Sequence, residues 1–283
     1  MTVKYPSPIL KGYADPDIIY ENGTYYFYAT SYHIKKGYEV LTSTDLVNWE
    51  NKGLALEGAW GYEHSYWAPD VKKLGDKYYM LASVCEHLGI AVADKPEGPF
   101  IPREAPLFEC TIDGHIFKDD DGTVWIYYVT WRKDHRYGLY CMRMTDGFEP
   151  VYESEKPVIF AEEPWESQQA KVAEAPYMLK HKGKYYLTYS GSHYESRLYA
   201  VGYAVADRPD GPFVKYTGNP ILVSDLKTEF GTGHHCITKD PDGNMLIVYH
   251  THRDGEHIHP RQISIKTLGF ETVRDGDDIL VCK

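Results

Sequence analysis

Two aspartates near the N-terminus, Asp15 and Asp17, bracket a proline and lead directly into an apolar, aromatic stretch, KGYADPDIIYENGTYYFYATS (residues 11–31). Charged groups at the start of a buried strand cost solvation free energy unless they are paired, hydrated or used in chemistry. Acidic residues recur in comparable surroundings as Asp113 in TID and Glu174 in EAPY. Carboxyl groups that converge in a fold can act as general acid and general base, so the elements that position them decide the interpretation.

The opening stretch is one of five copies of a strand–turn–strand unit. The other copies are WAPDVKKLGDKYYMLAS (67–83), IDGHIFKDDDGTVWIYYVT (112–130), EAPYMLKHKGKYYLTYSGS (174–192) and HHCITKDPDGNMLIVYHTH (234–252). Their turns contain Asn22-Gly23, Gly75-Asp76, Asp121-Gly122, Lys182-Gly183 and Asp242-Gly243, pairs that mostly supply the positive φ that tight hairpins need. The second strand of each copy is rich in tyrosine and apolar on both faces, which is typical of a strand packed between neighbouring sheets.

Aligning the copies places five residues at one equivalent position: Asp15, Ala68, Asp113, Ala175 and His234. After each copy in the sequence comes a segment whose pattern predicts a strand, a polar turn and an edge strand, at residues 40–50, 90–100, 142–150, 204–213 and 264–271. A repeat of about 50 residues with four strands has the size of a propeller blade. With 26 Tyr, 24 Gly and 17 Pro, the composition also favours short strands and turns. We expect an all-β protein in which residues 1–283 form a single five-bladed β-propeller with four-stranded antiparallel blades.

The first strands of propeller blades line the central axis, so equivalent residues at their starts meet around one mouth. Asp15, Asp113 and Glu174 would then share a small polar site, where each negative charge raises the pKa of the others. A protonated carboxyl facing an ionised one is what glycosidic cleavage requires. Taken singly, D-P-D is more often an Asx-type turn and E-A-P a common loop sequence, but their shared axial position favours a site. Five other aspartates are interpreted as turn or solvent-facing residues: Asp17, Asp70, Asp119, Asp120 and Asp121.

The ordered set ADPDI (14–18), YWAPDV (66–71), TID (111–113), EAPY (174–177) and GTGHH (231–235) resembles glycoside hydrolase family 43 over nearly the whole chain. The resemblance implies a five-bladed propeller that cleaves arabinose- or xylose-containing plant polysaccharides with inversion. It implies that Asp15 is the general base and Glu174 the general acid. Asp113 would raise the pKa of the acid and orient it.

Four further residues are candidates for the same site. Trp67 lies next to the axial position of the second copy, where an indole can stack on a sugar or fill the core between blades. His33 follows the second strand of the first copy and is expected at the rim, with a solvated loop histidine as the alternative. The resemblance assigns Arg261 to substrate binding while it holds Glu174 in place, and assigns His234 to a water-coordinated calcium ion on the axis. The alternatives are a rim salt bridge for Arg261 and a structural role for His234.

Composition excludes several classes of partner. The net charge of -11 and the absence of a basic stripe argue against nucleic acid. No window has the apolar length of a membrane span, and the N-terminus lacks a basic region followed by an apolar core, although a removed signal peptide leaves no trace. The five scattered cysteines lack C-x-x-C spacing, which disfavours zinc or a redox pair and favours the cytoplasm.

Loop composition predicts how the site is closed. The segments 33–39, 55–67 and 160–171 carry bulky residues, among them Trp60, Tyr62 and Tyr66, and would wall a pocket more naturally than flank a groove. We therefore expect an exo-acting α-L-arabinofuranosidase or β-xylosidase that releases terminal pentoses from hemicellulose- or pectin-derived oligosaccharides. The alternatives are an endo-arabinanase, a non-catalytic carbohydrate-binding propeller and a retaining fructan-type hydrolase.

Overall fold

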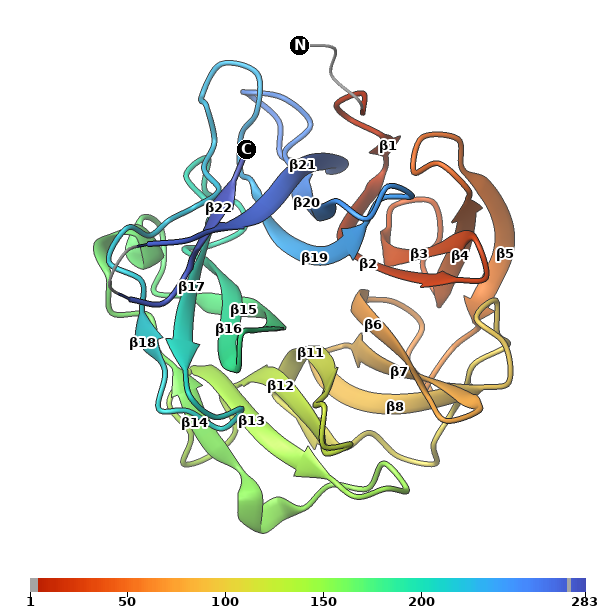
Figure 1. Cartoon of the computed structure of the whole chain (residues 1–283). Coiled ribbons are helices and arrows are strands. Elements are labelled where there is room, and N and C mark those ends of the chain that lie inside the picture. Colours follow the sequence, from red (N-terminus) through yellow and green to blue (C-terminus); the bar gives the residue numbers. More distant parts are fainter. Residues whose placement is uncertain (1–4, 274–275) are drawn as a thin grey trace.

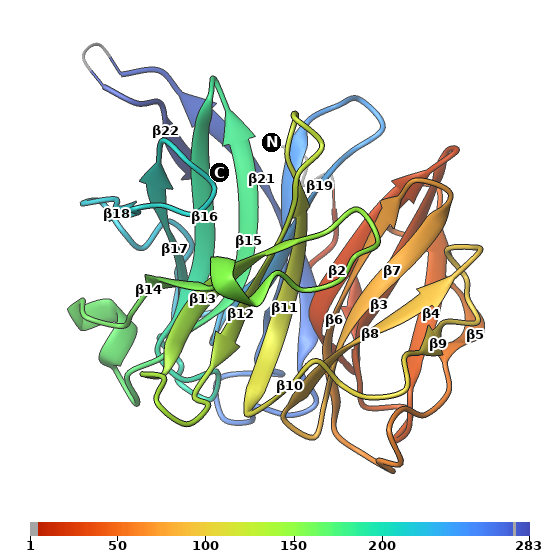
Figure 2. The ribbon, with the colours of Figure 1, turned by 90° about the horizontal axis from the view of Figure 1, so that it is seen from below.

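The computed structural model describes residues 5–273 and 276–283. Five antiparallel sheets stand around a central axis as the blades of a propeller (Figure 1). The sheets are steeply inclined to the plane of the ring, as the side view shows (Figure 2). The all-β fold with five four-stranded blades is therefore confirmed.

The strands follow the predicted repeat. The first blade contains β2 (Tyr13–Glu21), β3 (Thr24–Ser31), β4 (Tyr38–Ser43) and β5 (Glu50–Leu56). The second contains β6 (Tyr66–Leu74), β7 (Lys77–Val84) and β8 (His87–Ala93), with β9 (Ile101–Pro102) and β10 (Phe108–Glu109) both paired to β8. The third contains β11 (Thr111–Lys118), β12 (Val124–Thr130), β13 (Gly138–Met144) and β14 (Lys156–Ile159). The fourth contains β15 (Ala173–His181), β16 (Lys184–Gly191), β17 (Ala200–Ala206) and β18 (Val214–Lys215). Two 3-10 turns, η1 (Tyr152–Ser154) and η2 (Pro164–Ser167), lie in the connections.

The fifth blade is built from both ends of the described chain. β19 (Gly233–Lys239), β20 (Met245–Thr251) and β21 (Gln262–Glu271) come from the fifth repeat. β21 is then paired by β1 (Leu10–Lys11) at one end and by β22 (Ile279–Cys282) at the other. The sequence predicted a turn and an edge strand inside residues 264–271, and this is wrong because β21 runs through them unbroken. In the third blade the edge strand lies at 156–159 rather than within 142–150.

The core lies between the blades. Each of the five clusters of buried side chains joins neighbouring sheets; the cluster around Tyr28 and Val40 of the first blade, for example, includes Met80 and Ala91 of the second. Tyrosines of the second strands are fully buried there, and their hydroxyl groups bond to adjacent blades, as Tyr28 does to the carbonyl of Pro96. A buried aromatic ring contributes a large apolar area, while its polar tip needs such a partner.

The first strand of every blade contains a β-bulge at the aligned position. The pairing register slips there in β2, β6, β11, β15 and β19. The aligned residues all have left-handed backbone conformation, with φ of 53°, 39°, 56°, 52° and 41° for Asp15, Ala68, Asp113, Ala175 and His234. A bulge re-aims its side chain and is common next to active sites. The repeat thus presents five equivalent side chains to one mouth of the axis.

Four of the five bulges are held by a hydrogen bond from the backbone N–H to the preceding blade. Hydroxyl groups accept in three cases: Thr30 from Ala68 at 3.0 Å, Ser83 from Asp113 at 3.0 Å and Ser190 from His234 at 2.9 Å. At the closing junction His250 Nδ1 lies 3.4 Å from the backbone nitrogen of Asp15, but it donates to the Asp15 carboxylate, 2.9 Å away, so the first bulge is held through its side chain. The third blade has Val129 at this place, opposite Ile112, and there the carboxylate of Asp113 accepts from Ala175 N–H at 3.2 Å instead. Among the described residues, no helix is long and apolar enough to span a membrane.

Candidate active site

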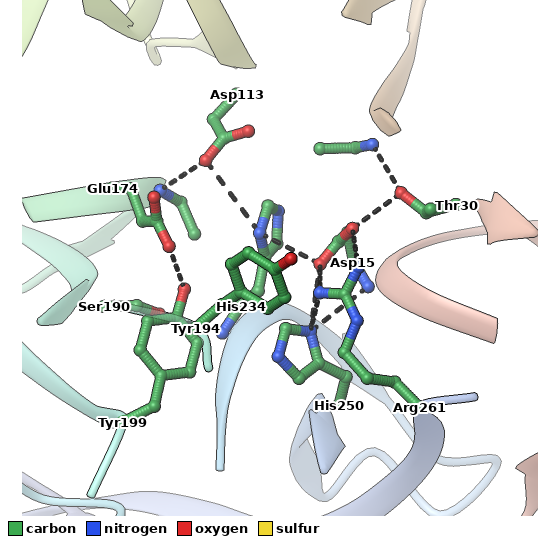
Figure 3. A network of polar contacts seen from close by, with 12 residues as sticks. Asp15, Thr30, Asp113, Glu174, Ser190, Tyr194, Tyr199, His234, His250 and Arg261 are labelled. Atoms are coloured by element: carbon green, nitrogen blue, oxygen red, sulfur yellow. Dashed lines mark hydrogen bonds and ion pairs between the residues drawn. The ribbon is translucent and has the colours of Figure 1, made fainter. Parts of the chain in front are cut away.

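A pocket of about 340 Å³ opens at the mouth where the bulges meet. Its lining includes Asp15 from the first blade, Asp113 from the third, Glu174 from the fourth and His234 and Arg261 from the fifth. All three carboxyl groups predicted from the repeat therefore come together at one site, as the close-up shows (Figure 3). Ligand pockets range from roughly 300 to 1,000 Å³, so the site suits a small ligand.

Asp15 is almost saturated with hydrogen-bond donors. Arg261 donates from Nη1 to Oδ1 at 2.8 Å and from Nη2 to Oδ2 at 3.3 Å, while Thr30 donates to Oδ2 at 2.6 Å. His250 Nδ1 lies 2.9 Å and His234 Nδ1 3.3 Å from Oδ1. Burial opposes the charged form of Asp15, but the charges of Arg261 and His234 and the bond to His250 outweigh it and hold its pKa well below the usual value. Asp15 is therefore ionised.

Glu174 lies in the opposite electrostatic situation. Burial raises its pKa to about 7, the negative charge of Asp15 adds to the shift, and hydrogen bonds from Tyr199 and Tyr137 oppose it. The Tyr199 hydroxyl donates to Oε1 at 2.7 Å. Among the described residues no cation forms an ion pair with Glu174, although the more distant charge of Arg261 also lowers its pKa. Glu174 is thus a carboxyl group that holds a proton up to about neutral pH.

Asp113 joins the other two carboxyl groups. Burial raises its pKa to about 7, with further contributions from Glu174 and Asp15 and an opposing one from His234. Its Oδ2 accepts the N–H of Ala175, the residue after Glu174, and lies 3.9 Å from His234 Nδ1. Asp113 therefore fixes the backbone that carries Glu174. The arrangement as a whole places one ionised carboxylate opposite two carboxyl groups that can be protonated.

Trp67 and Arg261 both line the pocket, and His33 does not. Arg261 was expected to hold Glu174, but its guanidinium bonds to Asp15 and, through Nε, to the hydroxyl of Tyr32 at 2.9 Å. The His33 ring is exposed, packs beside Tyr13 with 4.9 Å between ring centroids, and lies against Gly12. His33 therefore lies away from the pocket, whereas its neighbour Tyr32 accepts a bond from Arg261 on the pocket wall.

Most of the bulky side chains expected to wall the pocket do not line it. Trp60 donates from Nε1 to the carbonyl of Arg103 at 2.8 Å and covers Gly89, so it packs on the second blade. Trp165 of the 160–171 segment packs on Gly191 and Gly202 of the fourth blade. Among these segments only Trp67 lines the pocket, and its far wall is formed instead by Tyr194 and Arg261. The aromatic side chains Trp60 and Trp165 pack on the blades, and composition alone cannot distinguish such packing from a place in the pocket wall.

Asp17 and Asp70 are buried, so their interpretation as turn or solvent-facing residues is wrong. Asp17 accepts the N–H of Val71 at 2.7 Å, and Asp70 accepts the N–H of Ile116 at 2.9 Å. Each therefore ties the first strand of its blade to the next blade. Asp119 is also buried, with bonds from Lys180 and Tyr185, although it does begin a turn. Asp120 and Asp121 are exposed as predicted.

A cavity of about 20 Å³, enough for one water-sized body, lies on the axis below the pocket. It is lined by His234, His235, Asp17 and Asp70, among others. The described residues contain no group of three or more His, Cys, Asp or Glu side chains arranged to hold a metal ion. His234 Nδ1 faces Asp15 and Asp113, whereas the buried Nδ1 of His235 has no hydrogen-bond partner. Burial lowers the pKa of His235 to about 3, so this nitrogen belongs to a neutral ring.

The sequence reasoning missed His250, Tyr199 and Tyr137. His250 is fully buried and takes the position that serine or threonine occupies in three other blades, so aligning the ends of the second strands would have revealed it. The Tyr199 ring stacks on His250, with 5.6 Å between centroids and a 14° interplanar angle. A side chain on Gly233 would meet the Tyr199 ring at 2.2 Å, which explains the glycine of GTGHH. Tyr199 bonds to Glu174 and His250 bonds to Asp15, so this stacked pair of rings links the two carboxyl groups.

Comparisons with known proteins agree with this geometry. The family model for glycosyl hydrolases family 43 matches residues 5–273. A β-D-galactofuranosidase of Aspergillus niger is 30% identical over 275 residues, covering 87% of this chain and 76% of that protein. A β-xylosidase of Xylanibacter ruminicola is 31% identical, with 70% and 69% coverage.

A solved structure described as an endo-1,4-β-xylanase of Bacteroides thetaiotaomicron superposes with a TM-score of 0.89 at 36% identity, covering 98% of this chain and 96% of the other. The family match spans almost the whole propeller and includes all three carboxyl groups of the pocket. The chain therefore belongs to glycosyl hydrolase family 43 and is a glycosidase that hydrolyses O-glycosyl bonds.

Proposed function

We propose that this chain is an inverting, exo-acting α-L-arabinofuranosidase or β-xylosidase that releases terminal pentoses from arabinose- or xylose-containing oligosaccharides. The observation that carries the proposal is the contrast within one pocket between the ionised Asp15 and the protonated Glu174. Relatives described as a β-xylosidase and as xylosidase/arabinosidases support the pentose assignment. The fructan-type alternative has no support from these relatives.

In the proposed reaction Glu174 donates its proton to the leaving glycosidic oxygen. Asp15 accepts a proton from the water that attacks the anomeric carbon from the opposite face. Arg261, Thr30 and His250 hold the Asp15 carboxylate in one orientation. Asp113 positions the backbone next to Glu174 and could bond to a substrate hydroxyl with its remaining oxygen. Inversion requires a water between sugar and base, so we predict about 6.5–9.5 Å between the two reacting carboxyl groups.

Substitution of the acid and the base tests these roles. Asp15→Ala and Glu174→Ala should each lower kcat by about two to four orders of magnitude, because each removes a group that moves a proton in the transition state. For Glu174→Ala, a nitrophenyl pentoside should recover part of the rate because its leaving group needs no protonation. Both variants should keep the circular dichroism spectrum of the wild type. Turnover close to wild type in either variant contradicts the assignment of that residue.

Product analysis tests the mode of action. Proton NMR of the reaction should show the inverted anomer first, and linear arabinan or xylo-oligosaccharides should yield single pentoses from the start. The retained anomer contradicts inversion. A mixture of oligomers early in the reaction favours an endo-acting enzyme. Binding without any release of sugar from nitrophenyl glycosides favours a carbohydrate-binding propeller.

We also propose a weakly held calcium ion on the axis. His234 lines both the small axial cavity and the active-site pocket above it, and the buried Nδ1 of His235 beside it has no hydrogen-bond partner. Calcium prefers oxygen ligands, so waters of the active-site pocket would complete its coordination. The ion would supply positive charge beneath the three catalytic carboxyl groups. Removal by chelator should lower the melting temperature by a few degrees, with a smaller effect in His235→Ala; an unchanged melting temperature contradicts calcium binding.

A further inference from the structure

A second cleft adjoins the active-site pocket. It has a volume of about 620 Å³ and is lined by residues of the 31–37 and 63–67 segments and by the far side of Tyr194, Arg261 and His259. Three residues line both cavities: Trp67, Tyr194 and Arg261. The exposed ring of Tyr32 and the polar groups of Ser31, Lys35 and Glu63 make it a mixed aromatic and polar surface. Such surfaces suit the apolar faces and hydroxyl groups of sugars.

The wall between the two cavities is made of side chains. The Arg261 guanidinium lies 4.7 Å from the centre of the Tyr194 ring, and its Nη1 is tied to Asp15. Tyr32 closes the other side of Arg261 and bonds through its hydroxyl to His259 Nδ1 at 2.7 Å. Tyr194 is held less firmly: its hydroxyl makes a 3.3 Å bond to Glu195, next to it in the chain. Figure 3 shows the Tyr194 ring beside Arg261 and, in this view, in front of His234.

The position of the acid and base shows which end of the substrate this wall faces. Glu174 protonates the oxygen of the leaving group, so the leaving group lies on the Glu174 side of the pocket. The second cleft begins at Thr30 and Ser31, beside Asp15, because Thr30 bonds to that carboxylate. A glycan extending from the non-reducing side of the cleaved sugar would therefore enter this cleft if the wall were absent.

We propose that Tyr194 is the specificity-determining residue that closes the glycone end of the pocket and restricts the enzyme to terminal sugars. This rests on the proposed exo-acting function. The ring of Tyr194 blocks the passage to the second cleft, which is large and polar enough to take a further pentose. Replacing the ring with a small side chain joins the two cavities and admits a disaccharide or longer glycone.

Nitrophenyl glycosides of one pentose and of two linked pentoses, in the xylose and the arabinose series, test this proposal. The wild type should release a single pentose from the two-pentose compound before any nitrophenol. Tyr194→Ala should release nitrophenol together with the intact disaccharide, and raise the ratio of disaccharide to pentose at least about tenfold, because steric exclusion from a sugar-sized space is lifted. Tyr194→Phe keeps the ring and should give the wild-type products.

The outcomes separate this proposal from the proposed function. If the wild type releases single pentoses and Tyr194→Ala still does so, the wall proposal fails and the exo-acting assignment stands. If the wild type itself releases the disaccharide, the exo-acting assignment fails and the wall proposal with it. Tyr194→Leu provides a second open variant that keeps apolar packing on Arg261. Both open variants are first checked for a cooperative melting transition.

Discussion

Asp15 and Glu174 both carry carboxyl groups, and they titrate in opposite directions because their neighbours differ. Asp15 faces Arg261 and two imidazoles, whereas the nearest polar partners of Glu174 are the neutral hydroxyl groups of Tyr199 and Tyr137. Motif spacing in the sequence identified both residues. It could not show which groups surround them, because Arg261, His250 and Tyr199 approach from other strands and loops.

At this scale, pH dependence tests the Tyr199 hydrogen bond. Glu174 must be protonated to act, so activity should be full below its pKa of about 7 and fall as pH rises through it, while Asp15 stays ionised. The Tyr199 bond lowers the pKa of Glu174, so Tyr199→Phe should move the falling limb upward by about one to two pH units, since a bond to a charged group contributes about 1.5–3 kcal/mol. The measurement is kcat/KM against pH. Lower activity with an unmoved limb would mean that Tyr199 acts only in packing.

Among the elements, the bulged first strand determines where chemistry can occur. The repeat alignment predicted the five positions, and hairpin turns such as Asn22-Gly23 predicted the strand pairs, because these signals are local. The bulges themselves were not predictable, since Ala68 and Ala175 are ordinary residues whose left-handed conformation is imposed by the neighbouring blade. At the bulge of the fourth blade, the equivalent residue Val129 has no side-chain acceptor for the Ala175 N–H, so the Asp113 carboxylate accepts it. Asp113 therefore both holds a bulge and lines the active-site pocket.

The hydrogen bond that holds the Asp113 bulge can be removed alone. Ser83 is fully buried, and its hydroxyl accepts the N–H of Asp113 at 3.0 Å. Ser83→Ala should lower the free energy of unfolding by about 1–3 kcal/mol, because a buried N–H is left without a partner. It should also lower kcat, because Asp113 loses its fixed position. Urea titration and kinetics measure the two effects. Ser167→Ala removes one solvent-exposed bond to the carbonyl of Glu163 and should stay within about 0.5 kcal/mol of wild type.

For the whole molecule, ring closure was the part of the fold that local patterns could not predict. The fifth repeat looked complete, yet β21 is one long strand held by β1 near one end and by β22 near the other. β1 pairs with residues more than 200 positions away, which no local signal indicates. β22 pairs with residues 8 to 14 positions before it, but the repeat alignment ended the fifth unit at residue 271 and did not extend to this strand. The two terminal strands therefore hold the same blade at different distances from the active site.

This asymmetry predicts different effects for the two terminal strands. β1 pairs with Gln262 and Ile263, and Gly12 N–H donates to the carbonyl of Arg261 at 3.0 Å, so this strand fixes the residue that holds Asp15. β22 pairs with residues 268–271 and buries Leu280 against the fourth blade. Deleting residues 1–11 or 277–283 should lower the melting temperature in both cases, because each removes strand pairing and buried apolar area. Only the N-terminal deletion should also lower kcat/KM, by about tenfold or more, because misplacement of Arg261 would shift the Asp15 carboxylate that it holds. Activity is measured well below the melting transition of each variant. Equal losses of activity in the two deletions would contradict the link between β1 and Arg261.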